Sequence, residues 1–223
     1  MNPELFGTFG RSFGLVQASC EVVEQAFRTW QDDILSKWGM SLRSEIYSGT
    51  IIGALRGLLP RTSPIATKYL FWPVGQGWTL YFDNGVSGTD AGAPSVLSSR
   101  VHSNAIRVVM SQEIVDAVTK KIKQYGATIF EYHADGIERR HVFAANDGGK
   151  WKFGQAGIPF EFENVAAYNE RSIQKRFTPA MLLAYLRALG VELDANIGSE
   201  ASHSGYILTK IGKMPASLRE HFE

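Results

Sequence analysis

The sequence has almost no cysteine, because Cys20 is the only one among 223 residues. No intramolecular disulfide can form, which disfavours a small secreted domain held together by disulfides. A zinc site with two or more cysteine ligands is excluded for the same reason. We therefore expect a protein of a reducing compartment, most simply the cytoplasm.

Long apolar runs are missing as well. The longest stretch, residues 51–59, is interrupted by Gly53, Arg56 and Gly57, whereas a transmembrane helix needs about 20 apolar residues. Residues 1–14 lack a basic segment followed by an apolar run, so we expect no signal peptide. The sequence thus predicts a soluble protein that does not insert into a membrane.

The chain also lacks an excess of either charge. It has 23 basic and 22 acidic residues, whereas a dedicated nucleic-acid binder usually carries a clear basic excess. Hydrophobic residues make up 44% and charged residues 20%, which is ordinary for a globular protein. We expect one domain over residues 1–223, with a flexible loop at residues 194–205 before a short C-terminal tail.

Hydrophobic periodicity predicts the main elements. Apolar residues at helical spacing indicate helices at residues 15–38 and 111–125, and another that begins after Thr178. Alternating β-branched and aromatic residues indicate hairpins at residues 67–83 and 128–144. This order predicts an α+β fold, with a mostly antiparallel sheet of hairpins and helices packed on one face.

The second hairpin has the sharper local signal. Its two-residue loop, Asp135-Gly136, is typical of a type I′ turn. A regular register from that turn places Glu131 opposite Arg140 and His133 opposite Glu138. The same register places His133 and His141 on opposite faces, so we expect that they do not share a metal.

Catalytic and cofactor motifs are absent from the sequence. There is no G-x-S-x-G nucleophile motif, and Cys20 falls in the apolar stripe of a predicted helix. The glycines of Gly75-Gln76-Gly77 fit a hairpin loop better than a phosphate-binding loop. No histidine pair has metal-ligand spacing among His102, His133, His141, His203 and His221. We therefore predict no catalytic residue, no metal and no cofactor.

The polar loop after the first hairpin is the candidate site. It runs from Asp83 and Asn84 to Asp90, beside an aromatic strand that contains Tyr81. Such a loop could present an acid and a base, or bind a partner. The alternative is purely structural, with an Asx turn at Asp83-Asn84 and a helix cap at Asp90. We favour this structural interpretation over an acid–base pair.

Three sequence blocks resemble those of a group of bacterial cytoplasmic proteins similar in style to immunity proteins, which neutralise polymorphic or contact-delivered toxins. The first block comprises residues 54–60, 69–73, 77–85 and 88–91; the second comprises residues 144–153 with Gly157, Pro159 and Glu161; the third comprises residues 168–178 and 189–191. The resemblance implies a toxin domain as partner and brings no catalytic residues with it.

These observations lead to a ranked set of functional hypotheses. The first is a protein-binding module, an immunity protein that blocks the active site of a toxin through Tyr81, Asp83, Asn84 and Asp90. The second is an enzyme that acts on a small molecule or nucleotide with the Asp83 to Asp90 loop. The third is a structural or regulatory domain without chemistry.

Overall fold

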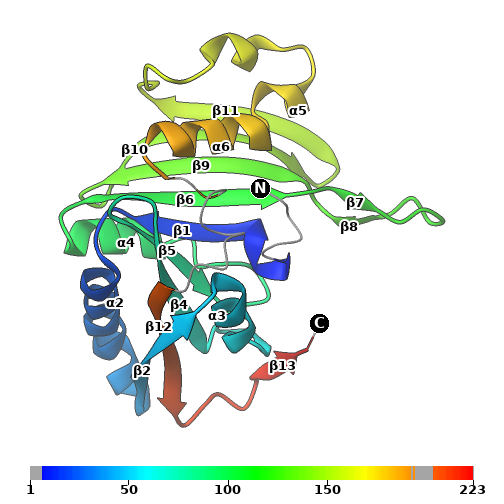
Figure 1. Cartoon of the computed structure of the whole chain (residues 1–223). Coiled ribbons are helices and arrows are strands. Elements are labelled where there is room, and N and C mark those ends of the chain that lie inside the picture. The colour runs from blue at the N-terminus through cyan, green and yellow to red at the C-terminus, as the bar shows by residue number, and fades with distance from the viewer. Residues whose placement is uncertain (1–6, 192, 194–202, 223) are drawn as a thin grey trace.

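The computed structural model describes residues 7–191, 193 and 203–222 (Figure 1). Its centre is a nine-stranded sheet with the strand order β11-β10-β9-β6-β1-β5-β4-β12-β2. All neighbouring strands in this sheet are antiparallel. The predicted α+β class with a large antiparallel sheet is confirmed.

The strands of this sheet are β1 (Ser12–Val16), β2 (Met40–Gly49), β4 (Lys68–Val74), β5 (Trp78–Asp83), β6 (Asn104–Ser111), β9 (Ala127–Ala134), β10 (Ile137–Asp147), β11 (Lys150–Gly157) and β12 (His203–Gly212). Two small sheets pair β3 (Arg61–Ser63) with β13 (Arg219–His221), and β7 (Ile114–Val115) with β8 (Ile122–Gln124). The helices are η1 (Gly7–Arg11), α2 (Cys20–Leu35), η2 (Ser36–Trp38), α3 (Ile51–Gly57), α4 (Ala93–Arg100), η3 (Val165–Asn169), α5 (Ile173–Arg176) and α6 (Pro179–Ala188).

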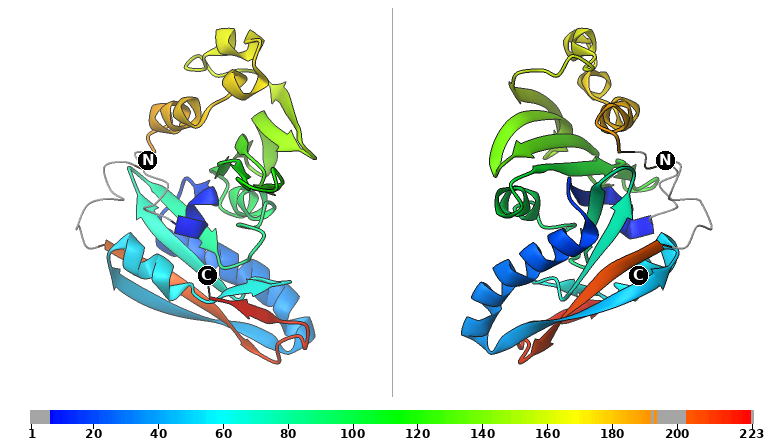
Figure 2. Two further views of the ribbon diagram at one scale, coloured as in Figure 1. Left: turned by 90° about the vertical axis from the view of Figure 1, so that its right-hand side faces the viewer. Right: turned by 60° about the vertical axis from the view of Figure 1, so that its left-hand side comes forward.

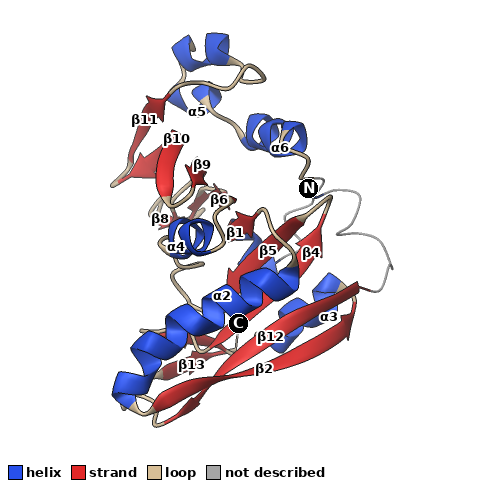
Figure 3. Ribbon diagram, turned by 90° about the vertical axis from the view of Figure 1, so that its left-hand side faces the viewer, coloured by secondary structure: helices blue, strands red, loops and turns tan. Residues whose placement is uncertain are grey.

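Helices cover both faces of the sheet, so the expectation that they pack on one face is wrong (Figure 3). Core residues of α2 and α4 pack on one face, and those of α3 and α6 pack on the other. The physical reason is visible in β5, in which every residue is buried. Leu80 and Phe82 join the core under α3 and α6, whereas Tyr81 joins the core under α2 and α4. A strand that is apolar on both faces needs cover on both.

The long helix expected at residues 15–38 is split in the structure. Residues 12–16 form β1, and α2 begins only at Cys20, because the Ser19 side chain accepts a hydrogen bond from Val22 N and caps the helix. At the other end η2 continues to Trp38, and Gly39 with a φ of 66° terminates it. The apolar residues before Ser19 therefore belong to a central strand.

The helix expected at residues 111–125 is wrong, because this segment contains the β7–β8 hairpin. The apolar residues of the predicted stripe have little to pack against: the exposed fraction is 44% for Ile114 and 89% for Val118. The Asp116 carboxylate instead accepts hydrogen bonds from Val118 N and Thr119 N and shapes a local turn. Helix propensity without a tertiary partner does not hold a helix in place.

The chain after α6 returns to the sheet as the strand next to the edge strand β2. Residues 194–202 of the loop predicted at 194–205 lie outside the described residues, and β12 begins at His203. This strand is inserted between β4 and β2 (Figure 2). The C-terminal segment is therefore an integral part of the sheet rather than a short tail. Among the described residues, no helix is long and apolar enough to cross a membrane.

The Asp135-Gly136 turn of the second hairpin is confirmed, with positive φ at both residues. The predicted register holds only next to the turn, where Glu138 lies opposite His133. A β-bulge between Glu138 and Arg140 then shifts the pairing by one residue.

The bulge reverses the faces of the residues that follow it. Arg140 lies opposite Tyr132, and His141 lies opposite Glu131, so the predicted Glu131–Arg140 pair is wrong. The neighbouring strand accommodates the bulge through Gly157, which has a φ of +79°. A Cβ there would lie 1.9 Å from the carbonyl oxygen of Arg139. The bulge therefore depends on a glycine that is distant in sequence.

Candidate functional site

The loop of residues 83–90, called the β5 loop below, is anchored by a fully buried Asn84. The Asn84 side-chain oxygen accepts hydrogen bonds from Thr67 N at 2.8 Å, Lys68 N at 2.9 Å and the Thr62 hydroxyl at 3.2 Å. Its side-chain amide donates to the carbonyl of Pro60 at 2.7 Å and to Thr67 Oγ1 at 3.1 Å. Asn84 therefore joins the end of β5 to the segment that precedes β4.

Asp83 closes the loop from the inside. Its carboxylate accepts hydrogen bonds from Gly85 N at 2.9 Å, from Asp90 N at 2.8 Å and from the Tyr81 hydroxyl at 3.4 Å. Burial raises the pKa of Asp83, and the hydrogen bonds from the two backbone amides oppose that shift. The contact with Gly85 N is the Asx turn predicted from the sequence.

Neighbouring elements hold the outer part of the β5 loop. The Thr89 hydroxyl donates a hydrogen bond to the carbonyl of Ser12 in β1 at 2.7 Å. The Arg61 guanidinium donates to the carbonyl of Val86 at 2.5 Å. Ser87 at the tip is exposed. The loop is thus fixed at its base and sides, and its tip faces solvent.

The structure brings the four predicted site residues together but exposes only one of them. Asp90 is exposed, whereas Tyr81, Asp83 and Asn84 have exposed fractions of 1%, 3% and 0%. Tyr81 therefore cannot serve as a surface anchor. The expected helix cap at Asp90 is also wrong, since Gly92 is the N-cap of α4 and Asp90 accepts a hydrogen bond from Gly92 N.

One side of the β5 loop borders a cleft with a cavity volume of about 300 Å³, called the Lys210 cleft below. Its lining includes Gln31, Tyr69, Asp83, Asp90 and Lys210. The Lys210 ammonium lies 5.3 Å from the centre of the Tyr69 ring and makes no hydrogen bond or ion pair to any described residue. Burial lowers the pKa of Lys210, while Asp83 and Asp90 oppose that shift.

The other side of the loop borders a second cleft, of about 320 Å³, called the arginine cleft below. Its lining contains three arginines and no acidic residue; they come from η1, β3 and β6 and are Arg11, Arg61 and Arg107. Ser87 lines both clefts. The tip of the loop therefore separates the Lys210 cleft, which contains residues of both charges, from the arginine cleft.

Sequence reasoning missed Lys210 and the arginine cleft. Lys210 lies on β12, and Arg11, Arg61 and Arg107 are far apart in the chain. No sequence motif contains these residues together, because they become neighbours of the loop only when the fold brings their elements next to one another.

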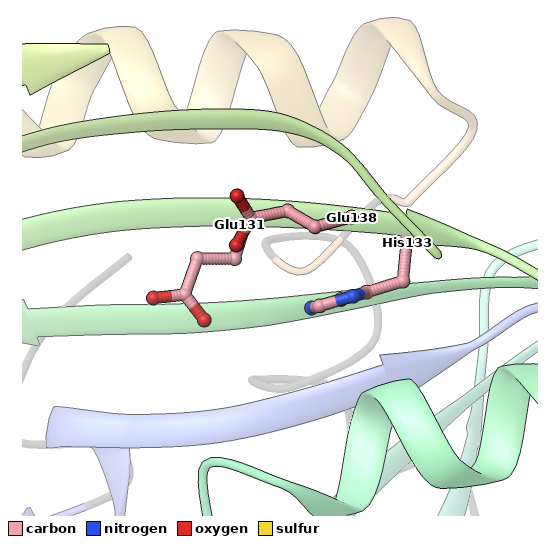
Figure 4. A group of neighbouring side chains, drawn as sticks. All are labelled: Glu131, His133 and Glu138. Atoms are coloured by element: carbon pink, nitrogen blue, oxygen red, sulfur yellow. The ribbon is translucent and has the colours of Figure 1, made fainter. Parts of the chain in front are cut away.

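A group on β9 and β10 has the donor atoms that a metal ion could use. Donor atoms of Glu131, His133 and Glu138 lie within 4.8 Å of one another, and their side chains project from the same face (Figure 4). Burial lowers the pKa of His133, although Glu131 and Glu138 oppose the shift. The bulge also places His141 on this face, so the expectation that His133 and His141 lie on opposite faces is wrong.

Cys20 is not placed as a nucleophile. Burial raises the pKa of its thiol to about 11, and a hydrogen bond with the Thr79 hydroxyl only partly opposes this. A thiol with such a pKa stays protonated at neutral pH.

Comparisons with protein-family models, curated proteins and solved structures find no match for this chain.

Proposed function

We propose that this chain is a protein-binding module that recognises its partner through the tip of the β5 loop and the two flanking clefts. In this proposal it acts as an inhibitor of the immunity-protein type, which covers the active site of a toxin domain. The observation that carries the proposal is a rigid polar loop between two open clefts.

Rigidity supports binding because ordering a loop on association costs free energy. The hydrogen bonds of Asn84 and Asp83 already hold the β5 loop in one conformation. An inhibitor that must occupy an active site benefits from this preorganisation. The same hydrogen bonds occupy the Asp83 carboxylate, which makes it a poor candidate for transferring protons.

The charges indicate what the partner presents. Asp90 on one side of the tip suits a basic side chain, and the arginine cleft on the other side suits an acidic side chain or another anion. A toxin active site that contains both basic and acidic residues has this chemistry. The nearly neutral net charge of the chain, +1, is consistent with a binding surface that carries both acidic and basic groups.

The test uses the toxin-like product of a neighbouring gene, expressed with and without this chain. We expect wild-type protein to restore growth and to bind the purified toxin domain in calorimetry. Ser87→Trp places a bulky side chain at the exposed tip and should abolish both effects while leaving the melting temperature unchanged. Ser41→Trp is the matched control, because Ser41 is also exposed and lies on β2, three strands from β5 in the sheet order.

Two results would contradict the proposal. One is a chain that neither binds nor neutralises the neighbouring product. The other is binding that Ser87→Trp leaves intact, since the contact would then lie elsewhere on the molecule.

A specific observation favours one second candidate, an enzyme or binding site for a small molecule in the Lys210 cleft. The amine of Lys210 has a lowered pKa and no hydrogen-bond or ion-pair partner among the described residues. Amines of this kind act as bases or nucleophiles in active sites. Lys210→Met should abolish small-molecule binding and only weaken toxin binding, whereas Arg11→Gln, which changes the arginine cleft alone, should weaken toxin binding and leave small-molecule binding intact. The two variants therefore separate the two functions.

A further inference from the structure

We propose that Glu131, His133, Glu138 and His141 form a binding site for one divalent transition-metal ion, with Zn²⁺ as the reference ion. The site lies on β9 and β10, apart from the β5 loop, and shares with the arginine cleft only Arg107, which contacts Glu131. Three observations carry the proposal: the proximity of the donors, a buried histidine without a partner, and a bulge that adds a fourth donor.

The first observation is the proximity of the donors. One donor atom from each of Glu131, His133 and Glu138 lies within 4.8 Å of the others. Tetrahedral bonds of about 2.0–2.1 Å place ligand atoms about 3.3 Å apart. Small side-chain rotations close this difference, and the Glu138 side chain is free to make them because 45% of it is exposed.

The second observation is the state of His133. Its exposed fraction is 7%, and neither ring nitrogen has a hydrogen-bond partner among the described residues. A buried polar group without a partner is costly, and such groups are uncommon in native proteins. The two carboxylates beside the ring make a cation a fitting partner for one of these nitrogens. Figure 4 shows the His133 ring and the Glu131 carboxylate on the same side of the strands.

The third observation is the bulge between Glu138 and Arg140. It turns His141 onto this face, where its Nε2 lies 3.5 Å from Glu131 Oε1 and its Nδ1 lies 3.9 Å from Glu138 Oε2. His141 lies outside the group of three whose donor atoms are all within 4.8 Å of one another, so its ring has to turn to become the fourth ligand. Without the bulge His141 would face the opposite core. Bulges commonly re-aim side chains next to functional sites.

Arg107 positions the Glu131 carboxylate. Its Nη1 donates a hydrogen bond to Glu131 Oε1 at 2.6 Å, and the contact of His141 is to the same oxygen. Glu131 Oε2 has no partner among the described residues and is left for a metal ion. A ligating carboxylate that is itself held by a hydrogen bond is typical of metal sites.

The donor set selects the class of ion. Imidazole nitrogens favour transition metals such as Zn²⁺, whereas Ca²⁺ and Mg²⁺ prefer oxygen ligands alone. Two imidazoles and two carboxylates can complete a four-coordinate zinc site. We therefore expect binding of Zn²⁺ and Co²⁺, and no comparable binding of Mg²⁺.

The experiment titrates the full chain, freed of metal with a chelator and carrying no histidine tag, with Co²⁺ and then with Zn²⁺. We expect one equivalent of Co²⁺ to bind with the visible absorption of a four-coordinate site, and Zn²⁺ to displace it. Zn²⁺ should also raise the melting temperature. Glu138→Gln, at a partly exposed position that should not affect folding, is expected to weaken binding more than about tenfold.

Two further variants complete the design. His133→Leu should abolish binding and the zinc-dependent rise in melting temperature. His102→Gln is the control, because His102 also lies beside a carboxylate, with its Nδ1 3.0 Å from Asp135 Oδ1, but on the exposed surface. The proposal is overturned if wild-type protein binds no Co²⁺, if Glu138→Gln and His133→Leu bind like the wild type, or if His102→Gln abolishes binding.

Discussion

The β5 loop and the face of β9 and β10 that carries the proposed metal site both bury polar side chains. They differ in whether those side chains have hydrogen-bond partners. In the loop, both the side-chain oxygen and the side-chain nitrogen of Asn84 have hydrogen-bond partners in the protein. His133 on β9 is almost as deeply buried and has none among the described residues. The first region therefore uses its buried polar group to hold its own backbone in place, whereas the second leaves a buried polar group without a partner among the described residues.

The opposite face of β9 and β10 holds a third kind of buried polar group, an ion pair between Arg140 and Glu163. There Arg140 donates hydrogen bonds to both carboxylate oxygens of Glu163, at 2.8 and 2.6 Å, and Tyr168 donates to Glu163 at 2.6 Å. The bulge therefore places Arg140 in a satisfied ion pair on one face, while His133 on the other face has no partner among the described residues. The substitutions below test each kind of group.

The largest effect is expected for Glu163→Gln, which leaves Arg140 as a buried charge without its partner. We expect a loss of about 3–5 kcal/mol in the free energy of unfolding near neutral pH. Urea denaturation measures it. A loss below about 1 kcal/mol would show that the pair does not hold the bulge in place.

The same variant has a defined pH dependence. Burial alone would raise the pKa of Glu163, but the hydrogen bonds from Arg140 and Tyr168 lower it overall from its usual value of 4.5. The unfolded chain then binds more protons, so the stabilisation is complete above the usual pKa and is lost as the pH falls through the lowered one. The stability difference between wild type and Glu163→Gln should be constant above the usual pKa of 4.5 and should shrink as the pH falls below it.

A somewhat smaller loss is expected for Asn84→Ala, which removes the hydrogen bonds that hold the β5 loop. The backbone amides of Thr67 and Lys68 lose their acceptor in a buried setting, so we expect a loss of about 2–4 kcal/mol. Asn104→Ala is the control, since the Asn104 side-chain amide donates only one hydrogen bond, to Gln17 at 2.7 Å. Equal losses in the two variants would contradict the anchoring role of Asn84.

His133→Leu is expected to increase the stability of the metal-free protein, in contrast to the two substitutions above. Leucine has a similar size and removes two buried nitrogens without partners, so the free energy of unfolding should rise by about 1 kcal/mol. Added Zn²⁺ should stabilise the wild type and remove this difference. If His133→Leu destabilises the metal-free protein, the ring has a partner there and the contrast with Asn84 fails.

The smallest effect on stability is expected for Asp90→Asn, within about 0.5 kcal/mol. Asparagine keeps an oxygen that can accept the hydrogen bond from Gly92 N, so the turn is retained. Binding to a toxin domain should weaken, mainly through a slower association rate. A drop in melting temperature with unchanged binding would assign Asp90 a structural role alone.

Sequence reasoning succeeded where the signal was local. The hairpin predicted at residues 67–83 is present as β4 and β5, and Trp78, Leu80 and Phe82 share one face of β5 because side chains along a strand alternate regardless of its neighbours. The α6 helix begins after Thr178 as expected, since the Thr178 side chain accepts a hydrogen bond from Met181 N.

The same reasoning failed where a distant partner decides. The apolar periodicity at residues 111–125 is real, but Val118 remains 89% exposed and gains little from packing, so no helix forms. The register of the second hairpin shifts at a bulge that requires Gly157 on the next strand. The site residues Asp83 and Asn84 were placed correctly in one loop, but Asn84 is buried against the segment that precedes β4, which lies far from it in the chain.

The sequence by itself determined the α+β class, the Asp135-Gly136 turn, the cap of α6 and the impossibility of an intramolecular disulfide. Only the tertiary structure decided that helices cover both faces, that Lys210 reaches the β5 loop, and that the histidines at positions 133 and 141 share a face. The physical reason is the distance along the chain over which each kind of interaction acts. Backbone preferences and side-chain periodicity act over a few residues, whereas burial, bulges and clefts depend on strands paired across the whole chain.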